Sequence, residues 1–91
     1  METTLADPDC HVLIALAAAS YVSKDVGAGA IAQTLGPPAD PMDVDSALDR
    51  LASRELVSDM GRGRWRVTSR GWEILNRRHA GACWETEVEG R

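Results

Sequence analysis

The apolar residues of this 91-residue chain follow a helical spacing up to about residue 54 and a strand spacing directly after it. Before that point they recur three and four positions apart, which is typical of helices that bury one face. After it, residues 55–60 (ELVSDM) and 64–68 (RWRVT) are short β-prone runs separated by GRG, whose two glycines can take the positive φ of a tight hairpin. We therefore expect helices followed by a β-hairpin in one domain, because 91 residues leave no room for a second core.

Helical patterns predict three helices before the hairpin and one after it, an α+β fold that is mostly helical. The expected ranges are residues 8–21, 28–35, 41–54 and 69–79. Asp40 followed by Pro41 marks the third start, because Asp can accept from free amides and proline loses no hydrogen bond in a first turn. Asp7 and Pro8 repeat this signature, and Thr68 is placed to cap the last helix.

Each of these elements has one apolar side. In the third helix the i, i+3, i+4, i+7 stripe consists of Val44, Ala47, Leu48 and Leu51. In the second β-run, Trp65 and Val67 alternate with two arginines, so one face is expected to pack while the other shows arginine. Trp72, in the last helix, is also expected in the core rather than on a stacking surface.

The two ends carry weaker patterns. Residues 8–79 are expected to form the domain, residues 1–7 an N-terminal extension, and residues 80–91 a partly disordered tail without a sustained period. Trp84 lies in that tail, and we expect it to pack on its own domain or on a dimer mate, because an exposed tryptophan is unusual.

The two cysteines, Cys10 and Cys83, are 73 positions apart, with no CxxC pair nearby. Both are expected to be reduced, with a disulfide as the alternative. No apolar run approaches the roughly 18 residues that a membrane span needs, and the acidic N-terminal stretch does not resemble a signal peptide. A cytoplasmic protein without membrane contact is therefore the expectation.

The net charge of −4 hides a strong asymmetry along the chain. Residues 1–49 hold eight acids and one base, which gives −7, whereas residues 50–78 hold eight arginines and three acids, which gives +5. A basic segment of this kind indicates an anionic partner more directly than the net charge of the whole chain does.

Three stretches together make the chain resemble a winged helix-turn-helix domain of the kind found in MarR-like and PadR-like regulators and in small archaeal or viral repressors. They are IAQTLG (31–36), VDSALDRLASRELV (44–57) and GRGRWRVTSRGWEIL (61–75). The resemblance implies a three-helix core, a β-hairpin wing and a C-terminal helix, with the third helix in the major groove of DNA. Glu55 departs from the pattern, because such sequences usually have glycine before the Leu-Val pair.

Double-stranded DNA is accordingly the expected ligand. On the third helix the candidate contact residues are Ser46, Asp49, Arg50, Ser53 and Arg54. In and beside the hairpin they are Arg62, Arg64, Arg66 and Arg70, which would bind phosphates or, alternatively, form a solvated basic face that protects an edge strand. For Arg50 and Arg54 the alternative is an ion pair with an acid one turn away on the same helix.

The third helix is nevertheless acidic. Asp40 and Asp43 are explained by capping and by the helix dipole. Asp45 and Asp49 lie further in and would repel phosphates unless they accept from a cytosine amino group, so they either select bases or mark a surface for a protein partner.

Two functions follow. The first is a sequence-specific DNA-binding regulator that represses transcription as a homodimer, and the second is a winged-helix module that binds a protein partner through the acidic helix. The sequence shows no phosphate-binding loop, metal-ligand spacing or catalytic set, and His11 and His79 are isolated. We therefore expect no enzyme activity, no cofactor and no metal.

Overall fold

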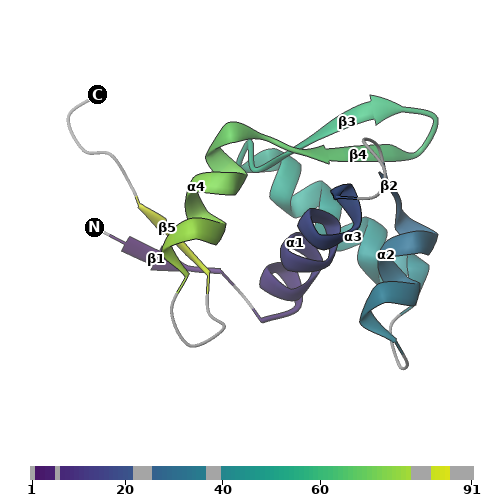
Figure 1. Cartoon of the computed structure of the whole chain (residues 1–91), viewed down its shortest axis with the longest axis horizontal. Helices are drawn as coiled ribbons and strands as arrows, with labels where there is room; N and C mark the ends of the chain where they lie inside the picture. The colour runs from purple at the N-terminus through teal and green to yellow at the C-terminus, as the bar shows by residue number, and fades with distance from the viewer. Residues whose placement is uncertain (1, 6, 22–25, 37–39, 79–82, 87–91) are drawn as a thin grey trace.

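The computed structural model describes residues 2–5, 7–21, 26–36, 40–78 and 83–86, and shows four helices and two small sheets in those ranges (Figure 1). The helices are α1 (Asp7–Ser20), α2 (Ala28–Leu35), α3 (Pro41–Ser53) and α4 (Ser69–Arg77). The strands are β1 (Glu2–Thr4), β2 (Val26–Gly27), β3 (Val57–Gly61), β4 (Arg64–Val67) and β5 (Trp84–Thr86). The α+β, mostly helical fold class is confirmed.

Helix α3 forms as its sequence predicts. The Asp40 side chain accepts from the Met42 amide at 2.8 Å, Pro41 occupies the first turn, and Asp43 adds an acid near the positive end of the helix dipole. The apolar stripe is fully enclosed, since Val44, Ala47, Leu48 and Leu51 are at most 3% exposed. This stripe packs α3 against α1 and α2, which fixes the opposite face of α3 toward solvent.

The chain leaves α3 through a left-handed residue. The Glu55 amide donates to the Ala52 carbonyl at 2.9 Å and the Leu56 amide to the Leu51 carbonyl at 3.0 Å, the two hydrogen bonds of a Schellman motif. Glu55 has a φ of 63° at the position where this motif usually carries glycine. At the position where the sequence pattern usually has glycine, Glu55 thus adopts a backbone conformation that glycine adopts more easily.

We predict that Glu55→Gly raises the free energy of unfolding by about 1 kcal/mol, because a Cβ atom in the left-handed region costs roughly that much. Chemical denaturation measures the change. Glu55→Ala is the matched control, since it removes the same carboxylate but keeps the Cβ atom. Equal stability of the glycine and alanine variants would contradict the proposed strain.

The hairpin alternates as expected. Trp65 and Val67 of β4 are each 6% exposed, whereas Arg64 and Arg66 face solvent. The turn uses positive φ at Gly61, Arg62 and Gly63. The prediction of a glycine-dependent turn between two short strands is confirmed, with an irregular register between Asp59 and Gly61.

A third strand, β2, was not predicted. Val26 pairs with Trp65 and Gly27 with Arg64, so the sheet order is β2-β4-β3. Two residues are too few to show a strand period, which explains why periodicity did not reveal this strand. Because Gly27 is also the N-cap of α2, this pairing brings the turn end of the hairpin beside the start of α2.

Helix α4 is attached to the α3–β3 junction by Thr68. Its hydroxyl accepts from the Gly71 amide at 3.1 Å, as the predicted cap, and donates to the Glu55 carbonyl at 2.7 Å. Gly71 lies directly on the Leu56 backbone, where a Cβ atom would overlap the Leu56 carbonyl oxygen. Helix α4 ends at Arg77, two residues earlier than expected.

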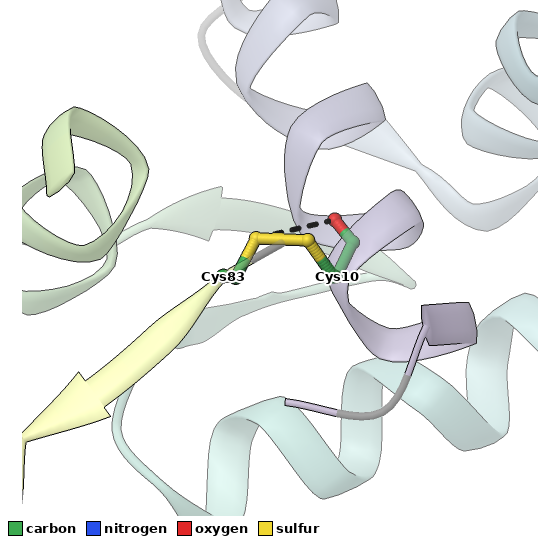
Figure 2. The surroundings of a disulfide bond; sticks show 2 residues. All are labelled: Cys10 and Cys83. Carbon is green, nitrogen blue, oxygen red and sulfur yellow. Dashed lines mark hydrogen bonds between the residues drawn. A yellow bond between two sulfur atoms is a disulfide. The ribbon is translucent and has the colours of Figure 1, made fainter. Parts of the chain in front are cut away.

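Segments near the two ends of the chain are joined within the described residues, which overturns one expectation. Cys10 of α1 forms a disulfide with Cys83, with a Cα–Cα distance of 5.6 Å that suits such a bond, so the prediction of two reduced cysteines is wrong (Figure 2). Strand β5 pairs antiparallel with β1, and the Leu5 amide donates to the Cys83 carbonyl at 2.9 Å. Within the segment expected to be a tail, residues 84–86 thus form a paired strand.

The spacing of apolar residues does not reveal these contacts, because a crosslink and a backbone ladder hold the segment, and not an apolar face. Leu5 and Cys83 are buried, and Trp84 is half-buried within its own chain, as one of the two expected arrangements for it. Within the described ranges, no helix has the length and apolar content that crossing a membrane requires.

Candidate nucleic-acid interface

The outward face of α3 carries both acids and polar residues. The solvent-exposed residues of this helix include Met42, Asp43, Asp45, Ser46, Asp49, Arg50 and Ser53. The Ser53 hydroxyl donates to the Asp49 carbonyl at 3.1 Å, one turn back, so its hydrogen is directed into the helix. Ser46 and Asp49 lie one turn apart and present oxygen atoms on the same side.

Arg50 is held by another helix. Its Nε–H group lies 3.0 Å and 3.1 Å from the two carboxylate oxygens of Asp9 in α1, and Nη2 donates to Oδ1 at 2.7 Å. The pairing of Arg50 with an acid one turn away on α3 is therefore wrong as an alternative, because its partner lies 41 positions earlier in the chain.

Burial is uneven across this pair. The Asp9 side chain is only 8% exposed, whereas that of Arg50 is 55% exposed. A buried carboxylate needs compensating donors, and Arg50 supplies them. The hydrogen bonds that Arg50 donates to Asp9 and, secondarily, the negative charge of Asp9 raise the pKa of Arg50 above its ordinary value, so the guanidinium stays charged throughout the physiological pH range.

The hairpin forms a basic surface on the side away from its packed face. Arg62 is exposed in the turn, and Arg64 and Arg66 are exposed along β4, opposite the buried Trp65 and Val67. Arg70 is exposed in the first turn of α4. We call Arg62, Arg64, Arg66 and Arg70 the hairpin arginines.

The candidate residues fall into two groups along the sheet. Arg62 and Arg64 belong to the turn end, beside the start of α2. Arg54 and Arg70 flank the junction at which Thr68 joins the end of α3 to α4, at the other end of the strands. Figure 1 shows the β3–β4 turn and α4 at opposite ends of the hairpin. A strand of four residues separates the two groups by about 13 Å, so together they span a surface and not a pocket.

An open groove of about 200 Å³ between α1 and α2 is lined by His11, Ile14, Ala15, Ala18, Thr34 and Leu35. No cluster of three or more metal-ligating side chains occurs among the described residues. His79 and the C-terminal residues 87–91 lie outside the described ranges.

Asp9 is the residue at this surface that sequence reasoning missed. It follows Asp7 and Pro8 at the start of a helix, where an acid is already explained by the helix dipole. Nothing in its spacing indicates a partner 41 residues away, so only the packing of α1 on α3 reveals the pair.

Comparisons of the chain with protein families, with curated proteins and with solved structures gave no match.

Proposed function

We propose that this chain is a winged helix-turn-helix domain that binds double-stranded DNA. The observation that carries the proposal is the hairpin, in which arginines occupy the solvent face of β4 and the turn while Trp65 and Val67 anchor the other face in the core. The order of three helices, a hairpin and a fourth helix supports the same interpretation. A rigid basic hairpin is suited to the evenly spaced phosphates of a duplex.

In the proposed complex, α3 lies in the major groove and the hairpin follows the sugar-phosphate backbone. Ser46, Asp49, Arg50 and Ser53 face the bases, with Asp49 as an acceptor for a cytosine amino group. The hairpin arginines and Arg54 bind phosphates. The charge asymmetry of the chain fits this division, since the acids concentrate before residue 50 and the arginines after it.

The biological role that we propose is repression of transcription by a homodimer, because two half-sites multiply the specificity of a small interface. The cytoplasm, where such a regulator meets its DNA, is the proposed location. The buried disulfide is unusual for this location, because disulfides are rare in cytosolic proteins except in those of hyperthermophiles.

Replacing Arg62 and Arg64 by glutamine is expected to weaken binding to all duplex sequences alike. Each neutralised phosphate contributes about 0.9 to the dependence of log affinity on log salt, so the double variant should flatten this slope by about 1.8. Fluorescence anisotropy with random-sequence duplexes, measured from low to moderate salt, gives both quantities.

The matched control is the Arg77→Gln, Arg78→Gln variant, which removes the same charge at the end of α4, far from the hairpin turn. It should leave the salt slope close to that of the wild type. If the hairpin variant binds as tightly as this control at low salt, the hairpin does not contact DNA and the proposal loses its main support.

A second function is favoured by one observation on α3. Asp43, Asp45 and Asp49 are all exposed, and Arg50 on the same helix is paired with Asp9. Such a surface fits a basic protein partner, as in a winged-helix adaptor or inhibitor. Replacing Asp45 and Asp49 by lysine separates the two functions, because it should strengthen binding to random duplexes if α3 faces DNA and leave it unchanged if α3 faces a protein.

A further inference from the structure

We infer that Arg50 reads a guanine in the major groove and that Asp9 is the residue that positions it. This inference rests on the proposed function and deepens it, because it assigns the base and the contact atoms. Its ligand is the guanine edge, which presents the N7 and O6 acceptors side by side.

The geometry of the pair leaves the far end of the arginine available. A guanidinium has five N–H donors in one plane. Asp9 takes the Nε–H group and one donor of Nη2, and no other acceptor is bonded to Arg50 among the described residues. The remaining Nη2 donor and both Nη1 donors lie at the far end of the fork, where two parallel hydrogen bonds to O6 and N7 are possible.

The support beneath Arg50 is rigid. Asp9 is 6% exposed and belongs to the first turns of α1, directly before Cys10. Cys10 is bonded to Cys83, so this turn is attached covalently to the C-terminal segment as well as packed on α3 (Figure 2). A long arginine side chain that is fixed in advance loses less conformational freedom on binding than one that is free in solution.

Charge argues for a base rather than a phosphate as the contact. The Asp9 carboxylate neutralises the guanidinium at close range, so the pair as a whole has little attraction for a phosphate. Guanine acceptors are uncharged and depend on directed donors, which Arg50 retains. The hairpin arginines then supply the charge attraction, and Arg50 supplies selectivity.

The test begins with selection of binding sites by the wild-type protein from a random-sequence duplex pool. Each guanine of the selected site is then replaced by 7-deazaguanine, which lacks only the N7 acceptor. We expect one guanine per half-site at which this replacement weakens wild-type binding by about tenfold. Arg50→Ala removes every donor of this side chain, and should be indifferent to the replacement at that guanine.

Asp9→Asn separates positioning from a structural role. It removes the carboxylate charge and replaces one of the two acceptor oxygens by an amide group, so the preference for that guanine should fall to within about threefold. Affinity for random duplexes should stay equal or rise, because a negative charge has been removed. A purely structural role would instead weaken specific and random binding together. Thermal unfolding of each variant verifies that it is folded under the binding conditions.

Three results overturn the inference. Wild-type protein that tolerates 7-deazaguanine at every position makes no such contact, whatever the variants do. If the Arg50→Ala and Asp9→Asn variants retain the wild-type sensitivity, the contact belongs to another residue. If no sequence is enriched and the hairpin variants bind like wild type, the proposed DNA-binding function itself is wrong. If a site is enriched but none of its guanines is sensitive, only this inference is wrong.

Discussion

Replacing both cysteines by alanine is expected to lower the free energy of unfolding by about 4 kcal/mol. A crosslink restricts the unfolded chain, and the restriction grows with the length of the closed loop, which here spans 73 positions between Cys10 and Cys83. The loss is a large part of the stability of a domain this small, for which about 5 to 10 kcal/mol is usual. Denaturant unfolding monitored by tryptophan fluorescence measures it.

Wild-type protein in a dithiol reductant is the matched comparison, because it loses the crosslink and keeps both side chains. The two samples should agree to within about 1 kcal/mol. The amides of the β1–β5 pair should lose protection from hydrogen exchange first, since Leu5 and residues 83–86 are held mainly by this junction. Unchanged stability in both samples would show that the crosslink does not form in the folded protein.

Gly71→Ala is expected to destabilise the fold by about 3 kcal/mol, at the upper end of the range for overpacked sites. The new methyl group would overlap the Leu56 carbonyl oxygen and lie 2.8 Å from Cγ1 of Val67. Helix α4 would have to move away from the α3–β3 junction, which would lengthen the Thr68 hydrogen bonds to Glu55 and Gly71. Chemical denaturation again gives the change in unfolding free energy.

A second helical glycine provides the control. Gly29 lies in α2, and a methyl group added there would have no atom within 4 Å, so Gly29→Ala should stabilise the protein by up to about 1 kcal/mol through helix propensity alone. If Gly71→Ala lowers the free energy of unfolding while Gly29→Ala raises it, the packing of Gly71 on Leu56, and not helix propensity, determines the effect of Gly71→Ala. A decrease of less than about 0.5 kcal/mol in the unfolding free energy of Gly71→Ala would refute the close packing.

The helices and the hairpin could be predicted because their information is local. Asp40 and Pro41 mark a start, the stripe from Val44 to Leu51 marks a buried face, and the glycines of the turn mark a reversal. Each of these signals lies within a few residues of the structure that it specifies, and helix α2 was predicted with its observed bounds.

The contacts that could not be predicted from the sequence join distant positions. Cys10 and Cys83, Asp9 and Arg50, and Val26 and Trp65 are paired across the fold, and no spacing rule connects them. Of the candidate DNA contacts, the exposure of Arg64 and Arg66 followed from the alternation on β4. The environment of Arg50 did not, because it depends on how α1 crosses α3.

The joined ends also change how this molecule can come apart. In most small domains, unfolding begins by fraying at a terminus. Here the disulfide closes residues 10–83 into a ring, and Glu2 lies opposite Thr86 in the β1–β5 ladder just outside it. The segment between the two cysteines has no free end, so its openings must arise within it, between the helices or along the hairpin. The surface proposed to bind DNA lies within that segment, so bound DNA would stabilise the regions at which the segment can open.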